Sequence, residues 1–236
     1  MAAWQQYRQQ GFQMLSAAVP ADTLAGLLAG LNGALRGSAG ERPRYGERNL
    51  IARVDAVRRL ALSDPLLRIA RQVLGAAARP VRSLYFDKLP GANWNVAWHQ
   101  DTSIAVRQRV ALDGFGPWSV KQGVDHVEPP LDFLSAMLTL RLHLDPAGAD
   151  NGALRVVPGS HAGGRLDSAA LLARVNQGPV QVCEAMPGDL LLMNPLLLHS
   201  SRKASRPLHR RVVHIEYSAR ALPAPLQWFD RAVPAQ

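Results

Sequence analysis

Two side chains that can bind a metal ion stand one residue apart in the stretch NVAWHQDTSIAV, residues 95–106. The stretch is rich in strand-forming residues, and in an extended strand residues i and i+2 point to the same side. His99 and Asp101 are therefore predicted to project together, with Gln100 turned to the opposite face. An imidazole and a carboxylate suit a metal ion, but two ligands cannot hold one tightly. A third ligand must come from elsewhere in the chain.

The best candidate for that third ligand is His199, which ends the apolar segment GDLLLMNPLLLHSS. A histidine in this position is often a structural residue of the core or its rim. Arg210 follows eleven residues later, at the start of another strand-forming segment. Two histidines and one carboxylate form the facial triad that leaves positions of Fe(II) open to other ligands. An arginine nearby can bind a carboxylate through two parallel hydrogen bonds.

Helices are predicted in the first third of the chain. Residues 20–37 place leucines at helical spacing, and Asp22 is the expected N-cap. A second helix is predicted in SDPLLRIARQVLG, where Asp64 can cap and Pro65 fits the first helical position. The polar segment between these helices, residues 36–49, is expected to be a loop.

From about residue 81 onward the chain reads as short strands separated by turns rich in glycine and proline. Helices followed by many strands predict a mainly β protein with flanking helices, namely a double-stranded β-helix (a cupin-like jelly roll). We expect one domain over residues 1–236, with a helical part at about 1–80 and a β-helix core at about 81–220. Residues 113–132 lack periodicity and are expected to form a lid or binding loop.

The composition limits the classes of function. No run approaches the ~18 apolar residues of a membrane span, and no secretory signal is apparent at the start. Cys183 is the one cysteine, so we expect a cytoplasmic location and no zinc site built from thiolates. The net charge of +9 comes mainly from scattered arginines. This pattern favours an anionic substrate or cofactor over nucleic acid.

The sequence resembles the phytanoyl-CoA dioxygenase family of Fe(II)- and 2-oxoglutarate-dependent oxygenases over roughly residues 84–217. A single HxD tripeptide is weak evidence, whereas several motifs in the family's order and approximate spacing are specific. The motifs that carry the resemblance are DKLPG at 87–91, HQD at 99–101, NGALRVVPGSH at 151–161, GDLLLMNPLLLHSS at 188–201, and Arg210.

The resemblance implies roles for six side chains. It places iron on His99, Asp101 and His199. It also implies that Arg210 binds the distal carboxylate of 2-oxoglutarate and that Ser201 forms a hydrogen bond with the same carboxylate. Lys88 matches a family lysine near the cofactor. Neighbouring residues of a strand point to opposite faces, so Arg211 is the alternative to Arg210.

The resemblance also implies the reaction, which consumes 2-oxoglutarate and O₂ and releases succinate and CO₂ while a small-molecule substrate is hydroxylated. Related halogenases have a small apolar residue at the position of Asp101, so hydroxylation or another oxidation is expected here. Two alternatives are an AlkB-like nucleic-acid demethylase and a non-catalytic member that acts as a binding protein.

Three further residues have open roles. Arg141 shares a strand face with His143, and if that face lies inside the barrel, Arg141 could anchor an anionic substrate. His161 is either a structural residue or a substrate contact at the mouth of the site. Trp118 either packs in the core or covers the substrate.

Overall fold

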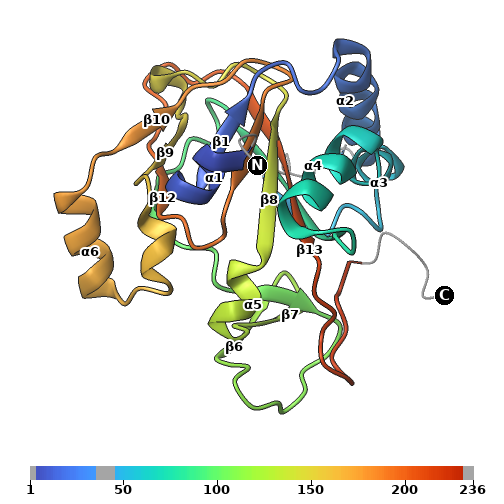
Figure 1. The fold of residues 1–236 in the computed structure, drawn as a ribbon. Coiled ribbons are helices and arrows are strands. Elements are labelled where there is room, and N and C mark those ends of the chain that lie inside the picture. The colour runs from blue at the N-terminus through green and yellow to red at the C-terminus, as the bar shows by residue number, and fades with distance from the viewer. Residues whose placement is uncertain (1–3, 36–45, 231–236) are drawn as a thin grey trace.

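The computed structural model describes residues 4–35 and 46–230, and its largest element is a 6-stranded sheet in the order β1-β11-β8-β13-β3-β2 (Figure 1). Neighbouring strands in this sheet are antiparallel. The strands are β1 (Phe12–Leu15), β2 (Gly46–Arg48), β3 (Arg79–Lys88), β8 (Met137–His143), β11 (Leu190–Met193) and β13 (Arg210–Ser218). We call it the large sheet.

A second, 4-stranded sheet in the order β10-β9-β12-β4 packs against the inner face of the large sheet. Its strands are β4 (Val96–His99), β9 (Leu154–Val156), β10 (Gln181–Cys183) and β12 (His199–Ser201). Leu191 and Met193 of the large sheet join Leu154 and Val156 of the small sheet in one buried cluster. Two facing antiparallel sheets are the arrangement expected of the jelly roll.

Helices α2 (Ala21–Leu35), α3 (Asp55–Ala61) and α4 (Asp64–Leu74) cover the outer face of the large sheet (Figure 1). Alternation along β8 explains this, because Leu138, Leu140 and Leu142 join the helices in the main core while Arg141 and His143 point inward. The remaining helices are α1 (Gln5–Gln10), α5 (Leu131–Ser135) and α6 (Ser168–Gln177). No helix in residues 4–35 and 46–230 is long and apolar enough to cross a membrane.

Both helices begin earlier than predicted, α2 by two residues and α4 by one. Helix α2 begins at Ala21, so Asp22 lies in its first turn instead of capping it. Helix α4 begins at Asp64, and its N-cap residue is Ser63. In both helices the aspartate still lies where its charge is favourable, beside the positive end of the helix dipole.

The predicted loop at residues 113–132 is wrong in part, because it contains β6 (Trp118–Lys121) and β7 (Val124–Val127). These strands form a 3-stranded sheet with β5 (Ile104–Val106). Gln122 and Gly123 connect them with φ angles of 50° and 75°. Positive φ at both positions is the requirement of a tight two-residue hairpin turn. The predicted loop at 36–49 also contains a strand, β2, whereas residues 36–45 lie outside the described part.

A matched pair of leucine substitutions tests where the core lies. Leu140 is fully buried between the large sheet and its helices, whereas Leu172 on α6 is 58% exposed. Leu140→Ala is expected to lower the free energy of unfolding by about 2–5 kcal/mol, because it leaves a cavity. Leu172→Ala is expected to change it by less than about 0.5 kcal/mol. Chemical denaturation of both variants measures this, and equal effects would contradict the assigned packing.

Candidate active site

His99 and His199 lie side by side because they are direct cross-strand partners in the small sheet. Their ring centroids are 4.1 Å apart. The Nδ1 atom of His99 lies 2.8 Å from the carbonyl oxygen of Ala97, and that of His199 lies 2.9 Å from the carbonyl oxygen of Leu197. An Nδ1–H that donates to the backbone leaves Nε2 as the lone-pair donor, which is how metal-binding histidines are usually held.

Asp101 completes a group of three possible ligands, although it lies beyond the end of β4. Its Oδ1 is 3.9 Å from His99 Nε2, and its Oδ2 is 3.7 Å from His199 Nε2. One ligand atom from each of the three residues lies within 4.8 Å of the others. The structure therefore brings together the three residues that the sequence singled out, although the strand predicted to carry both His99 and Asp101 ends at His99.

The backbone around Asp101 is fixed by hydrogen bonds in place of strand pairing. The Asp101 N–H donates to the carbonyl oxygen of Pro195 at 2.8 Å. The Gln100 side chain donates to the carbonyl oxygens of Gly164 and Leu196 at 2.7 and 2.6 Å and accepts from the Leu166 N–H at 2.9 Å. Gln100 is thus bonded away from the ligand group, as predicted, and it holds the segment that presents Asp101.

The protonation states of these groups suit metal binding. Burial lowers the pKa of His199 to about 4, so its ring is neutral near pH 7. Burial alone would raise the pKa of Asp101, but the surrounding imidazoles and Arg82 outweigh it and lower the pKa to about 2. Two imidazole nitrogens and one carboxylate are the donor set that fits Fe(II) with other positions left open.

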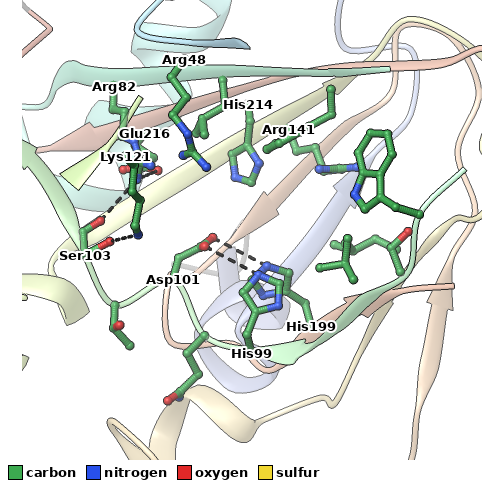
Figure 2. Close-up of a pocket in the computed structure, with 18 of the residues that line it drawn as sticks. Arg48, Arg82, His99, Asp101, Ser103, Lys121, Arg141, His199, His214 and Glu216 are labelled. Carbon is green, nitrogen blue, oxygen red and sulfur yellow. Dashed lines mark hydrogen bonds and ion pairs between the residues drawn. The ribbon is translucent and has the colours of Figure 1, made fainter. Parts of the chain in front are cut away.

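The ligand group faces a cavity of about 340 Å³ whose opposite wall is the inner face of the large sheet (Figure 2). Register along β3 and β13 supplies that wall, because alternate residues of each strand point inward. Four inward pairs lie across these two strands: Lys88 with Arg210, Phe86 with Val212, Leu84 with His214, and Arg82 with Glu216.

The two neighbouring arginines of β13 have separate environments. Arg210 is buried and lines the cavity. Arg211 points to the other face and forms a two-pronged ion pair with Asp145, with Nε–Oδ2 and Nη2–Oδ1 distances of 2.8 and 2.6 Å. Of the two candidates for a carboxylate clamp, Arg210 is the one placed in the cavity.

The charges at this end of the cavity fit an anionic ligand. Nε and Nη1 of Arg210 and Nε of Arg141 are buried and have no hydrogen-bond partner among the described residues. Burial, followed by the charge of Arg210, lowers the pKa of Arg141 to about 9. Donors of this kind are costly to bury unless a ligand accepts from them. The carboxylate of a cosubstrate would satisfy them.

Ser201 and Lys88 lie in two layers beside Arg210. Ser201 lines the cavity, and its hydroxyl donates to the carbonyl oxygen of Gly152 at 2.9 Å. Lys88 is fully buried behind it and donates from Nζ to Ser201 Oγ at 2.7 Å and to the Arg202 carbonyl oxygen at 2.8 Å. Lys88 therefore does not line the cavity, and its contact with a ligand there would be indirect, through Ser201.

Arg141 points into the barrel, where it lines the cavity. The other two residues with open roles lie elsewhere. His161 Nε2 is 3.2 Å from the Arg8 carbonyl oxygen, on the side of α1. Trp118 packs in the cluster around the 3-stranded sheet, and Arg109 lies over its ring. Neither is part of the cavity wall.

The family model described as phytanoyl-CoA dioxygenase (PhyH) matches residues 7–212 of the sequence. The chain belongs to the phytanoyl-CoA dioxygenase family. This membership confirms the expectation of an Fe(II)- and 2-oxoglutarate-dependent dioxygenase with a jelly-roll fold. No curated protein matches the sequence of this dioxygenase.

Solved structures of similar fold cover nearly the whole dioxygenase. The carbocyclase SnoK from nogalamycin biosynthesis has a TM-score of 0.70 at 18% identity, over 92% of this chain and 82% of its own. AviO1 from Streptomyces viridochromogenes Tue57 has a TM-score of 0.65 at 26% identity, over 95% and 97%. EctD from S. alaskensis, with 2-oxoglutarate and 5-hydroxyectoine, has a TM-score of 0.70 at 19% identity, over 92% and 76%.

Histidine substitutions test the ligand group directly. His99→Ala and His199→Ala are each expected to weaken Mn(II) binding by more than the roughly 10–100-fold typical of losing an outer partner of a metal ligand. His209→Ala is the control, because this histidine pairs with Asp87 on the surface at 3.0 Å. Equilibrium titration of metal-free protein measures the affinities. An unchanged affinity in His199→Ala would show that the metal binds elsewhere.

Proposed function

We propose that this dioxygenase holds Fe(II) on His99, Asp101 and His199 and uses 2-oxoglutarate and O₂ to hydroxylate a small molecule. One observation carries the proposal: the three ligand atoms lie within 4.8 Å of one another and face the cavity that contains the buried Arg210. The family membership supports the same reading.

Each residue has a defined task in this proposal. Fe(II) held by these residues would supply the oxidising chemistry with O₂, and 2-oxoglutarate would be converted to succinate and CO₂. Arg210 binds the distal carboxylate of 2-oxoglutarate through its unsatisfied N–H groups. The Ser201 hydroxyl would donate to the same carboxylate after turning away from the Gly152 carbonyl oxygen, and the Lys88 amino group, which donates to the Ser201 oxygen, keeps that oxygen in position. The side chains of His99 and Asp101 are 39% and 32% exposed, so a bound substrate would have to complete the exclusion of water.

A small-molecule substrate is supported by the size of the cavity and by the similar proteins. A volume of about 340 Å³ is near the lower end of the roughly 300–1,000 Å³ usual for small-molecule sites. The structure of EctD contains 5-hydroxyectoine, and that of SnoN contains nogalamycin RO. Cytoplasmic location stays a prediction from the single cysteine.

Anaerobic reconstitution tests the proposed function. Addition of Fe(II) and then 2-oxoglutarate is expected to produce the weak visible charge-transfer band of the chelate. Compounds are then screened for oxygen-dependent release of succinate. Asp101→Ala is expected to lose substrate-coupled turnover, and full activity in this variant would contradict the proposed ligand set.

The adjacent arginines of β13 offer a matched test of cosubstrate binding. Arg210→Met is expected to raise the Kd of 2-oxoglutarate by about 30-fold or more, because losing one partner of a buried charge pair costs roughly 2–5 kcal/mol. Arg211→Met removes the same charge one residue away but breaks only the pair with Asp145. It is expected to lower stability and leave the Kd within about 2-fold, since it makes no contact in the cavity. Titration of the charge-transfer band measures both values, and the reverse order would make Arg211 the clamp.

A further inference from the structure

The cavity has a second group of cations, away from the proposed cosubstrate clamp. Figure 2 shows Asp101, His99 and His199 between two sides of the cavity, with Arg48 and Lys121 toward one side and Arg141 toward the other. No sequence motif pointed to Arg48 or Lys121. We call these two residues the distal cation pair.

Strand register explains why Arg48 reaches the cavity. Arg48 of β2 is the partner of Leu84, Leu84 is the partner of His214, and His214 is the partner of Arg141. These positions form one inward-facing row across four strands. Strands lie about 4.8 Å apart, so the backbones of Arg48 and Arg141 are roughly 14 Å apart. Lys121 comes from a different sheet, at the end of β6 beside its hairpin turn.

The distal cation pair lacks a carboxylate partner in the part of the chain that the structure describes. The nearby acid Glu216 is bound to Arg82 at 2.9 Å, and both side chains are almost fully buried. Glu47 points to the outer face and binds Arg53 at 3.0 Å. Lys121 donates to the neutral Ser103 hydroxyl at 2.7 Å.

The remaining acid in the cavity, Asp101, is assigned to the metal. Arg82 and Glu216 neutralise each other. If Asp101 binds the metal, the positive charges of Arg48 and Lys121 therefore remain without a neutralising carboxylate at this end of the cavity. Burial, followed by the neighbouring guanidinium groups, lowers the pKa of Lys121, and burial followed by Arg82 lowers that of Arg48. The fold therefore concentrates cations here at a cost that a bound anion would offset.

We propose that the substrate is a small anion whose carboxylate, phosphate or phosphonate group binds Arg48 and Lys121, on the side of the metal ligands opposite Arg210 and Arg141. This inference rests on the proposed oxygenase function, because it assigns the other cationic end to 2-oxoglutarate. The acidic group would anchor one end of the substrate and leave the remainder beside the iron ligands. The cosubstrate shares the cavity of about 340 Å³, so the part of the substrate that enters it is small.

The test uses the Fe(II)-loaded protein under anaerobic conditions with saturating 2-oxoglutarate, which fills the other cationic end. Methylphosphonate and acetate serve as minimal anionic probes and dimethyl sulfone as a neutral one, all at constant ionic strength. Binding is followed as a saturable rise in Tm with probe concentration. Both anions are expected to stabilise the wild-type protein, and dimethyl sulfone is expected to have no effect. The anion that binds more tightly identifies the acid, and either order supports the proposal.

Three variants locate the binding. Arg48→Gln and Lys121→Gln are each expected to weaken binding of the tighter anion by at least about tenfold, the usual effect of removing a hydrogen bond to a charged group. Arg206→Gln removes an equal charge from a side chain that is 84% exposed and lies outside the cavity wall, so it serves as the control. Equal anion binding in Arg48→Gln, Lys121→Gln and wild type would overturn the proposal, as would a wild-type protein that binds neither anion.

The charge-transfer band, recorded in the same samples, separates this inference from the proposed function. If the band forms in the wild type but the anions do not bind, the substrate class is wrong and the oxygenase function stands. If the band does not form, the proposed cosubstrate site is wrong. Formation of the band in Arg48→Gln and Lys121→Gln would show that their defect lies in anion binding and not in the fold.

Discussion

The pairing of β4 with β12 is the constraint on which the site depends. It sets His99 directly opposite His199, so two imidazoles from segments a hundred residues apart meet without any help from a loop. Each ring is then oriented by the backbone carbonyl two residues earlier, which belongs to Ala97 or Leu197. Asp101 is added from outside the ladder, through the backbone bond to Pro195 and the three hydrogen bonds of Gln100. The ligand group is therefore built mainly from regular structure, which is more rigid than loops.

The opposite wall shows how a barrel interior can be both core and binding site. Apart from Arg211, the outward residues of β8 and β13 are mainly apolar and pack on helices, whereas their inward residues include Arg141, Arg210, His214 and Glu216. Part of the interior, around Phe12 and Leu191, remains an ordinary apolar cluster between the sheets. The buried Arg82–Glu216 pair lies beside Arg48 and Lys121 and neutralises itself, so separate cations remain on either side of His99, Asp101 and His199 (Figure 2).

Sequence reasoning worked where chemistry and periodicity point to the same residues. Strands with apolar alternation, such as β8 and β13, were predictable, as was the continuous apolar run of β11. Residue type and family spacing singled out His99, Asp101 and His199, which the structure brings close together. Arg48 and Lys121 could not be found in this way. Arg48 lies on a three-residue strand inside a polar segment, and Lys121 lies in a hairpin formed by a Gln-Gly turn. Their place in the cavity depends on strand register between distant segments, which a single sequence does not reveal.

The ion pair between Arg211 and Asp145 has a consequence for the strand that carries it. A shift of β13 by one residue would exchange its two faces, so that Arg211 entered the barrel and Arg210 left it. Nine residues of β13 pair with β3. At the start of β13, the Asp145 carboxylate also accepts hydrogen bonds from both the backbone N–H and the side chain of Arg211. The Arg211–Asp145 ion pair on the outer face of the sheet thus helps to fix the register of β13, so that Arg210 faces the interior and Arg211 does not.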